Sequence, residues 1–322
     1  MKITAIIVAA GKGERAGLTL PKQYAALGGK PLVAHSVAAF AQHPAISDII
    51  VVIGPEQDDL ARAALVGLPV TAFVTGGAER QESVRAGLAA AHDAHIVLVH
   101  DAARPFLTAA VIDRLIAACR LHKAAVPVLP VVDTLARGSE ALGPVVDRTA
   151  LMRIQTPQAF HRETLAHAHS AWNNGPATDD AQMVRALGID VAQVAGDKML
   201  EKITLPQDIV EAEERLASQL VSRTGLGFDV HRLADGEELW LGGIKIDHSQ
   251  GLAGHSDADV ALHALTDALL GALGDGDIGT HFPPSDPQWR GARSDQFVRH
   301  AAQLIRDAGG RIDHVDVTLI CE

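Results

Sequence analysis

Short apolar runs alternate with helical patterns over the first 130 residues, and this alternation restricts the fold more strongly than any other feature. The runs are rich in β-branched residues and occupy 3–10, 48–54, 69–75, 95–101 and 123–130. Between them, apolar side chains recur every three or four residues, as in helices, over 31–43, 57–67, 80–94 and 108–122. Buried strands that alternate with helices form βαβ units. The sequence therefore predicts an α/β fold with a Rossmann-like, mostly parallel sheet covered on both faces.

The pattern changes after residue 130. Turn residues divide short extended pieces between 131 and 157, which indicates a β-arm that projects from the sheet. Helical patterns return at 161–173, 179–187 and 205–222. After a very short linker we expect a strand at 225–230, an extended pair at 239–246, helices at 256–273 and 294–308, and a strand at 314–320. A length of 322 residues suits two domains, so we expect a first domain over 1–223 and a smaller α/β domain over 224–322.

The composition argues against several classes of protein. A formal net charge of −11 disfavours a nonspecific nucleic-acid binder, which needs a basic face. The two cysteines, Cys119 and Cys321, form no CxxC pair, so neither a disulfide framework nor a thiolate zinc site is expected. No apolar stretch is long enough to cross a bilayer. These features favour a protein of a reducing cytoplasm that has no nucleic-acid or membrane partner.

A glycine loop, AAGKGERAGLTLPKQY (9–24), directly follows the first expected strand. Gly11 and Gly13 allow backbone N–H groups to approach a ligand closely, as phosphate-binding loops require. Arg15 and Lys22 add two cations beside the loop. The loop matches neither the P-loop nor the full GxGxxG pattern, and a glycine turn with a solvated basic cluster is the alternative interpretation.

Two later strand ends carry further polar groups. Asp101 follows an apolar run, where a carboxylate facing a phosphate loop is well placed to hold Mg²⁺ together with substrate phosphates. The alternative is that Asp101 only caps the next turn. Gly76, Gly77 and Ser83 supply glycines and a hydroxyl at another strand end.

In the second domain, GFDVH (227–231) directs Asp229 and His231 to one side of an extended segment, because residues i and i+2 of a strand point the same way. In the helix expected at 256–273, Asp259, His263 and Asp267 recur every four residues and share one face. Asp229, His231 and His263 supply the number of ligands that a catalytic zinc takes while it keeps one position open. A solvated polar helix face is the alternative.

The motifs of the first domain resemble one family as a set. The matching motifs, which stand in the family's order, are AAGKGER (9–15), PKQY (21–24), GGAERQESV (76–84), VLVHDAARP (97–105), DT (133–134), DR (147–148), TPQAF (156–160), ATDDA (177–181) and KIT (202–204). That family is 2-C-methyl-D-erythritol 4-phosphate cytidylyltransferase, of the non-mevalonate pathway of isoprenoid biosynthesis. The resemblance covers residues 1–223 and implies a nucleotidyltransferase that joins CTP to a polyol phosphate. Transfer to another sugar or polyol phosphate is the alternative.

The resemblance also implies a role for each matching residue. Arg15, Lys22 and Lys202 would bind the CTP phosphates, and Asp101 would bind Mg²⁺ with them. The loop glycines Gly11 and Gly13 would lie beside the nucleotide, and Gly76, Gly77 and Ser83 would lie near the cytosine. The methylerythritol phosphate would contact Thr134, Arg148, Thr156 and Thr178. The nucleophile is itself an ionised phosphate, so positioning and charge stabilisation suffice and no general base is needed.

The second domain resembles 2-C-methyl-D-erythritol 2,4-cyclodiphosphate synthase. The matching motifs are GFDVH (227–231), the long segment from GHSDADV to HFPPSD (254–286), and VDVTLI (315–320). The resemblance implies zinc, or another divalent metal, on Asp229, His231 and His263. It places His255 and Ser256 near the terminal phosphate and Asp277 in the methylerythritol pocket. The implied reaction is a cyclisation that expels CMP, so the chain would combine a transferase and a lyase.

Members of the second family continue for several tens of residues beyond the strand expected at 314–320. We therefore expect the second domain to lack its C-terminal part. The families also imply a dimeric first domain and a trimeric second domain, which could together build a hexamer. A metal-stabilised assembly module without turnover is the alternative for the second domain.

Overall fold

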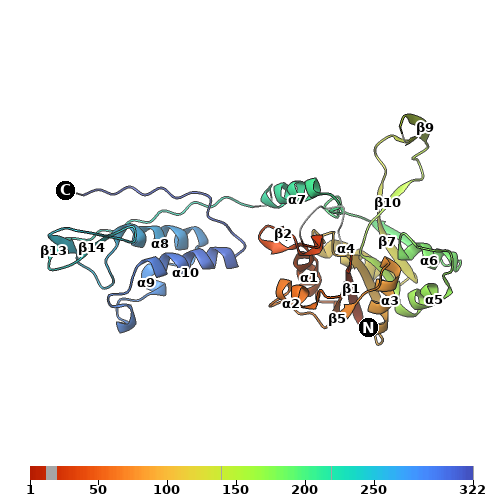
Figure 1. Ribbon diagram of the computed structural model, residues 1–322, viewed down its shortest axis with the longest axis horizontal. Coiled ribbons are helices and arrows are strands. Elements are labelled where there is room, and N and C mark those ends of the chain that lie inside the picture. Colours follow the sequence, from red (N-terminus) through yellow and green to blue (C-terminus); the bar gives the residue numbers. More distant parts are fainter. Residues whose placement is uncertain (12–19, 139, 219, 322) are drawn as a thin grey trace. The chain divides into compact units, whose positions relative to one another are not determined.

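The computed structural model describes residues 1–11, 20–138, 140–218 and 220–321. They divide into two compact units, Met1–Ala217 and Ser218–Glu322 (Figure 1). An eight-stranded sheet in the order β10-β7-β11-β6-β1-β4-β5, with β12 on β7, forms the centre of the first unit. Its strands are β1 (Ile3–Ala9), β4 (Asp48–Ile53), β5 (Ala72–Thr75), β6 (Ile96–Asp101), β7 (Ala124–Pro130), β10 (Met152–Ile154), β11 (Gln158–His161) and β12 (Ala192–Ala195). β1 pairs parallel with β4 and β6, and β4 with β5, so the predicted mostly parallel sheet is confirmed.

The sequence pattern does not predict β11 and β12. β11 lies antiparallel between two strands, with Ala159 opposite both Leu98 of β6 and Ala125 of β7. β12 runs parallel to β7 and places Ala192 opposite Ala125. Each strand has four residues, too few to establish a period of two. Their pairing partners, which are distant in sequence, make them strands.

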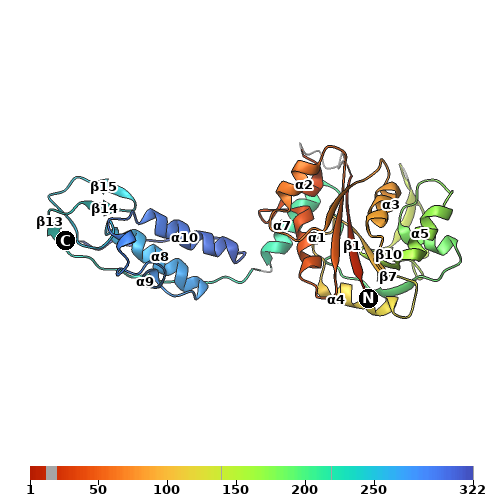
Figure 2. The same ribbon diagram turned by 90° about the horizontal axis from the view of Figure 1, so that it is seen from below.

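Helices cover both faces of the sheet (Figure 2). Alternate side chains of β1 point to opposite faces: Ile3 and Ile7 join the apolar cluster that contains α1, α2 and α4 residues, whereas Ile6 joins the cluster on the side of α3, α5 and α6. The first group of helices is α1 (Leu32–Ala41), α2 (Asp58–Ala64) and α4 (Ala109–Cys119). The second is α3 (Arg80–Ala90), α5 (Arg162–Ala171) and α6 (Asp180–Ala186). Burial on both faces explains why the strand sequences are continuously apolar.

Shorter elements complete the first unit. β8 (Leu135–Gly138) and β9 (Leu142–Val146) pair into a hairpin that projects away from the sheet, which is the predicted β-arm (Figure 1). A short 3-10 helix, η2 (Lys22–Tyr24), precedes the small hairpin of β2 (Ala26–Leu27) and β3 (Lys30–Pro31). α7 (Pro206–Ser218) packs through Ala212 on Leu27, Leu32 and Ile203.

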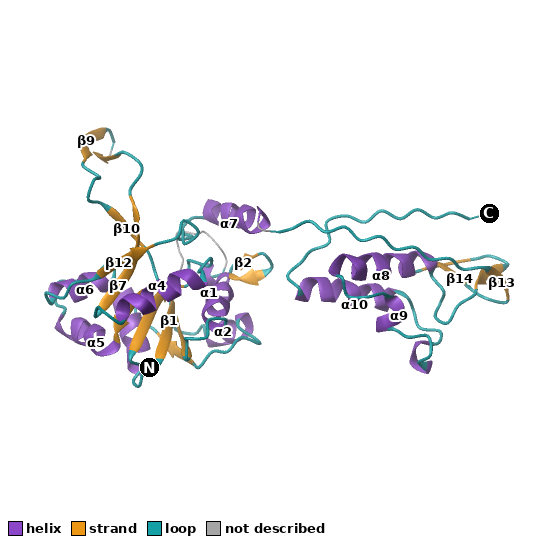
Figure 3. Cartoon of the chain, turned by 180° about the vertical axis from the view of Figure 1, so that it is seen from behind, coloured by secondary structure: helices purple, strands orange, loops and turns teal. Residues whose placement is uncertain are grey.

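The second unit is built around two packed helices (Figure 3). α8 (Val260–Leu273) and α10 (Asp295–Asp307) bury Leu269, Leu270, Ala301 and Ile305 between them. The short helices α9 (Ile278–His281) and η3 (Pro287–Trp289) lie between α8 and α10 in the sequence. β13 (Leu233–Asp235) pairs with β16 (Gln250–Leu252), and β14 (Leu239–Leu241) pairs with β15 (Ile244–Ile246).

Three local expectations for this unit are wrong. Residues 225–230 and 314–320 are not strands, because among the described residues β13 to β16 pair only with one another. A strand exists only where a neighbour accepts its backbone hydrogen bonds, and a local apolar pattern does not supply that neighbour. The helix expected from 256 begins at Val260 instead. Its cap is Asp259, whose buried carboxylate accepts from the backbone N of Leu262 at 3.1 Å.

The segment before β13 lies directly against α8. A Cβ placed on Gly227 would lie 1.8 Å from the carbonyl oxygen of Ala264, and one on Gly225 would lie 1.8 Å from that of Ala268. The two glycines therefore let an extended backbone touch a helix backbone. The same period of two carries Asp229 and His231 to the side that faces α8. Leu226 and Phe228, on the other side, are 92% and 81% exposed.

This contact predicts that Gly227→Ala destabilises the second unit. We expect its free energy of unfolding to fall by about 3 kcal/mol. The atom that the added Cβ meets is a backbone carbonyl oxygen of α8, which cannot rotate away as a side chain could. Hydrogen–deuterium exchange of α8, resolved by mass spectrometry, measures the effect. Gly271→Ala is the matched control: nothing lies within 4 Å of an added Cβ there, and alanine favours a helix. Equal exchange in the two variants would contradict the backbone contact.

Candidate active sites

A cavity of about 460 Å³ lies at the carboxyl ends of β1 and β6 in the first unit. This is the edge where parallel sheets bind ligands. Its walls include six of the residues predicted from the sequence, namely Gly11, Lys22, Gly77, Ser83, Asp101 and Lys202. Gly13 and Arg15 lie outside the described residues. The fold therefore gathers, from four separate segments, the side chains expected to bind a nucleotide.

The Asp101 carboxylate, which lines this cavity, forms ion pairs with two basic side chains. Its Oδ2 lies 2.7 Å from Nζ of Lys202, and its Oδ1 lies 3.2 Å from Nε of Arg80. Burial alone would raise the pKa of Asp101. The positive charges of Arg80 and Lys202 lower the pKa by more than burial raises it, so it lies well below its usual range. The carboxylate is therefore ionised at neutral pH, as a magnesium ligand must be.

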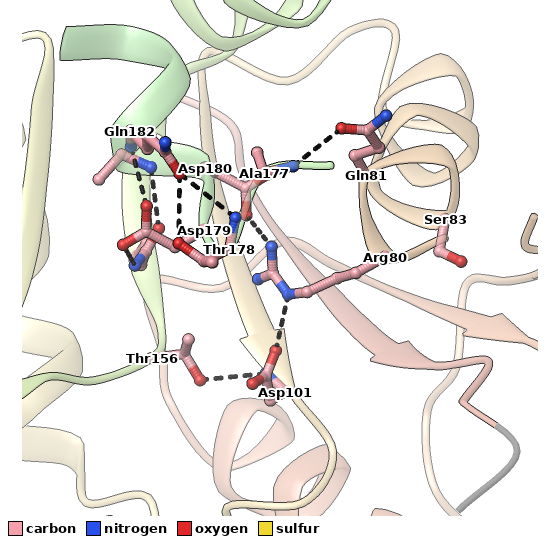
Figure 4. A network of polar contacts seen from close by, with 12 residues as sticks. Arg80, Gln81, Ser83, Asp101, Thr156, Ala177, Thr178, Asp179, Asp180 and Gln182 are labelled. Carbon is pink, nitrogen blue, oxygen red and sulfur yellow. Dashed lines mark hydrogen bonds and ion pairs between the residues drawn. The ribbon is translucent and has the colours of Figure 1, made fainter. Parts of the chain in front are cut away.

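Arg80 connects Asp101 to a second buried acid (Figure 4). Its Nη1 lies 2.7 Å from Oδ2 of Asp180, which has no exposed side-chain surface. The other oxygen of Asp180 lies 3.0 Å from Nε2 of His169. Burial raises the pKa of Asp180, but the charge of Arg80 and the hydrogen bond from His169 lower it below its usual value. Asp101 and Asp180 thus hold the guanidinium group from two sides, at the wall of the cavity.

Backbone contacts shape the remaining walls. Nζ of Lys22 donates to the carbonyl oxygen of Ile203 at 2.7 Å, which joins the glycine-loop side of the cavity to the 202–204 segment. A Cβ on Gly76 would lie 2.5 Å from Oγ of Ser83, and one on Gly77 would lie 2.4 Å from Glu82. Side chains at these two positions would collide with the start of α3. The glycines are therefore needed to bring this turn against the helix.

Other predicted residues of the first domain lie outside the cavity wall. Thr156 is buried behind Asp101, where its Oγ1 accepts from the backbone N of Asp101 at 3.1 Å. Thr178 donates through Oγ1 to Gln182 at 3.2 Å, beside Asp180 (Figure 4). Thr134 and Arg148 are exposed near the base of the β-arm. Arg148 donates to the carbonyl oxygen of Val132, so it ties the two sides of that base together.

The second unit brings together the three predicted metal ligands. One ligand atom from each of Asp229, His231 and His263 lies within 4.8 Å of the other two. Oδ2 of Asp229 lies 2.9 Å from Nε2 of His231 and 3.0 Å from Nδ1 of His263. Burial alone would raise the pKa of Asp229. The two neighbouring imidazoles lower the pKa by more than burial raises it, which favours the ionised carboxylate.

The donor set fits a divalent cation. Nδ1 of His231 lies 2.7 Å from the carbonyl oxygen of Ala253, which can only accept, so this contact favours a proton on Nδ1. Nε2, which lies 2.9 Å from Asp229, is then the nitrogen that would bind a cation. Two imidazole nitrogens and a carboxylate oxygen thus converge in a partly buried place, which is a typical zinc ligand set.

The other predicted residues of the second domain surround this cluster or stand apart from it. Ser256 lies 3.0 Å from Nε2 of His263, and His255 is exposed on the same loop. Asp277 is exposed and caps α9, with Oδ1 accepting from the backbone N of Thr280 at 2.8 Å. Asp267 of α8 accepts from the backbone N of Ile278 at 2.7 Å, so it anchors the segment that carries Asp277.

Both parts of this chain are similar in sequence to known proteins. The family model of 2-C-methyl-D-erythritol 4-phosphate cytidylyltransferase, IspD, matches residues 3–218, and that of the YgbB family matches residues 222–322. The chain is 57% identical over 321 residues to the bifunctional enzyme IspD/IspF of Rhizorhabdus wittichii, covering 99% of this chain and 83% of that protein. The bifunctional enzyme IspD/IspF of Novosphingobium aromaticivorans is 51% identical over 99% of this chain and 83% of its own length. The chain belongs to the bifunctional IspD/IspF family.

Solved structures agree with this membership. The bifunctional IspDF of Campylobacter jejuni aligns with a TM-score of 0.58 and 30% identity, covering 95% of this chain and 79% of that one. The 2-C-methyl-D-erythritol 4-phosphate cytidylyltransferase of Thermus thermophilus aligns with a TM-score of 0.58 and 39% identity, covering 67% of this chain and all of its own. The first unit is thus an IspD domain and the second a cyclodiphosphate synthase (IspF) domain of an isoprenoid-biosynthesis enzyme. Within the described ranges, no helix has both the length and the apolar character that a membrane span requires.

The motifs of the IspD domain contain two residues that the sequence analysis does not single out. Arg80 stands inside GGAERQESV, and Asp180 stands inside ATDDA. A charged residue within a motif is ordinarily solvated, so the motifs alone do not show that these two pair across the fold. A signal does exist, because an arginine beside a glycine turn at a strand end is a common anion-binding arrangement.

The network predicts that Asp180→Asn impairs nucleotide binding by the IspD domain. We expect the KM for CTP to rise about tenfold, or about 1.4 kcal/mol, because Arg80 loses the carboxylate that holds it at the cavity wall. Steady-state kinetics of diphosphate release measure it. Asp179→Asn is the matched control, since Asp179 caps α6 through Gln182, whereas the ion pairs of Arg80 are with Asp101 and Asp180. If both variants gave the same KM, Asp180 would not be needed to hold Arg80.

Proposed function

We propose that the IspD domain joins CTP to 2-C-methyl-D-erythritol 4-phosphate. An oxygen of the methylerythritol phosphate forms a bond to the α-phosphorus of CTP. The bond from that phosphorus to the bridging oxygen breaks, and diphosphate leaves with the electron pair. The products are 4-diphosphocytidyl-2-C-methyl-D-erythritol and diphosphate. The observation that supports this assignment best is the cavity in which Lys22, Lys202 and Asp101 meet.

The charges in that cavity suit phosphoryl chemistry, which depends on positioning and electrostatic stabilisation. In the proposed mechanism Lys22 and Lys202, with Arg15, neutralise the triphosphate and the charge that develops during transfer. Asp101 would hold Mg²⁺ with the CTP phosphates, and Lys202 would then move from Asp101 to the nucleotide. The further proposed contacts are Gly11 and Gly13 with the nucleotide, Gly76, Gly77 and Ser83 with the cytosine side, and Thr134, Arg148, Thr156 and Thr178 with the methylerythritol phosphate.

For the IspF domain we propose cyclisation of 4-diphosphocytidyl-2-C-methyl-D-erythritol 2-phosphate. An oxygen of the 2-phosphate forms a bond to the β-phosphorus, and the bond from that phosphorus to the CMP oxygen breaks. The products are 2-C-methyl-D-erythritol 2,4-cyclodiphosphate and CMP. Asp229, His231 and His263 would bind zinc, or another divalent metal, which as a Lewis acid orients the phosphate oxygens. His255 and Ser256 would contact the terminal phosphate, and Asp277 the methylerythritol part.

Two variants separate the proposed sites. Lys22→Ala should lower kcat/KM for CTP by about 10²–10³-fold, as expected for loss of a charge aimed at the transition state. It should leave CMP release by the IspF domain unchanged.

His263→Ala should remove the bound zinc, measured by metal analysis, and abolish CMP release while diphosphate release continues. Lys22→Ala with wild-type turnover would refute the first site, and His263→Ala with stoichiometric zinc would refute the second.

We also propose that the chain forms a homo-oligomer, with dimer contacts through the IspD domain, trimer contacts through the IspF domain and a hexamer where both form. Exposed apolar side chains support this: Leu142 and Val145 of the β-arm are 89% and 69% exposed. In this proposal the IspD domain spans residues 1–223 and the IspF domain spans residues 224–322. Sedimentation velocity tests it, with Leu142→Asp/Val145→Asp expected to remove the dimer contact. A wild-type monomer at micromolar concentration would rule out the assembly.

A further inference from the structure

Ser294 occupies an unusual position beside the metal cluster. It is the N-cap residue of α10, yet its side chain makes no capping hydrogen bond to that helix. Its hydroxyl is instead directed inwards, and the residue has no exposed surface. Oγ lies 2.9 Å from Nε2 of His263 and also contacts Oδ1 of Asp257. A buried hydroxyl that is withheld from its helix and placed between an imidazole and a carboxylate requires an explanation other than capping.

The direction of these hydrogen bonds follows from the groups involved. The Asp257 carboxylate can only accept, so the Ser294 hydroxyl donates its proton to Asp257. The Ser294 oxygen then has only lone pairs left for His263. Ser294 therefore favours the His263 tautomer whose Nε2 carries the proton and donates to Ser294. Nδ1 lies 3.0 Å from Asp229, whose carboxylate also accepts and so favours a proton on Nδ1 as long as no cation is bound there.

Asp257 is itself held in place by the backbone. Its Oδ2 accepts from the backbone N of Ser294 at 3.0 Å, and its own backbone N donates to the carbonyl oxygen of Ala292 at 3.0 Å. Asp257 and Ser294 therefore keep a fixed position relative to each other and to the start of α10. The ring of Phe297, in the first turn of that helix, lies beside the His263 ring with a centroid distance of 6.2 Å.

The two imidazoles of the cluster are thus oriented by different means. His231 is fixed by a carbonyl oxygen, that of Ala253. The ring of His263 has no carbonyl partner among the hydrogen bonds of the described residues, and its Nε2 lies near the hydroxyls of Ser256 and Ser294. A hydroxyl alone can donate or accept and leaves the proton of the ring undetermined. Of these two hydroxyls, Ser294 alone donates to a carboxylate in the part of the chain that the structure describes, so Ser294 sets a direction.

We propose that Asp257 and Ser294 are a positioning pair, which keeps the His263 proton on Nε2 and so presents Nδ1 to a divalent cation. This inference rests on the proposed metal site of Asp229, His231 and His263. It adds two residues that act through a ligand and touch neither the metal nor the substrate. Partners of this kind raise the basicity of a ligand and fix its ring, and their loss typically weakens metal binding about 10–100-fold.

The test uses the full chain with zinc alone as the probe. The zinc Kd is measured by chelator competition for the wild type, Ser294→Ala and the control Ser256→Ala. We expect Ser294→Ala to bind zinc about 10–100-fold more weakly. Ser256→Ala should stay within about threefold of the wild type, because removing a hydroxyl that sets no direction leaves the tautomer unchanged. Equal affinity of Ser294→Ala and the wild type would overturn the proposal.

A second measurement reports the proton directly. Long-range ¹H–¹⁵N spectra of metal-free protein at pH 8, assigned with His263→Gln, distinguish the two neutral tautomers. We expect a larger share of the Nε2–H form in the wild type and in Ser256→Ala than in Ser294→Ala. The same tautomer populations in the wild type and in Ser294→Ala would refute the positioning role even if zinc binds. A wild type that binds no zinc would refute the metal site, while the spectra still decide the tautomer.

Asp257→Asn keeps the result interpretable if Ser294→Ala fails to fold. The hydroxyl remains, but the carboxylate that sets its direction is gone, so we expect a smaller share of the Nε2–H form than in the wild type and weaker zinc binding. Circular dichroism of the metal-free variants measures folding separately. A purely structural role would lower the thermal stability of Asp257→Asn and leave both its tautomer and its zinc Kd as in the wild type.

Discussion

The ionised carboxylate of Asp101 is the interaction on which the IspD site depends. It stands at the end of β6, in the middle of a sheet whose strands are buried on both faces, so its position is fixed by the core. Arg80 reaches it from α3, and Lys202 reaches it from a segment 101 residues further along the chain. Without Asp101, two cations would face each other across the cavity. The carboxylate therefore allows an anion-binding site to be assembled before any nucleotide is present.

The IspF domain reaches a comparable result by close backbone contact. Its helices bury a small core, and its short strands pair only locally. What places Asp229 and His231 against His263 is the approach of 225–227 to α8, which the absence of side chains on two glycines permits. The proposed metal ligands thus depend on steric closeness in one domain, whereas the basic side chains proposed to bind phosphate depend on charge balance in the other.

The sequence predicts those features whose cause is local. Continuous apolar runs predict β1, β4 and β6, because burial on both faces requires them, and a period of two predicts that Asp229 and His231 point together. Features whose cause is distant in sequence escape it. β12 is a strand because β7 accepts it, and 225–230 is not one because no described neighbour does so. No periodicity carries that information.

The same division separates the functional residues that the sequence reveals from those it does not. Lys22, Asp101 and His263 stand out in the sequence because each lies in a motif whose residue types suit ligand binding. Arg80 with Asp180, and Ser294 with Asp257, face other protein groups, and their spacing in sequence is set by the fold. A carboxylate that serves to orient another side chain looks the same in sequence as one on the solvated surface. Its partner, buried within hydrogen-bonding distance, is what distinguishes it, and only the folded chain brings that partner to it.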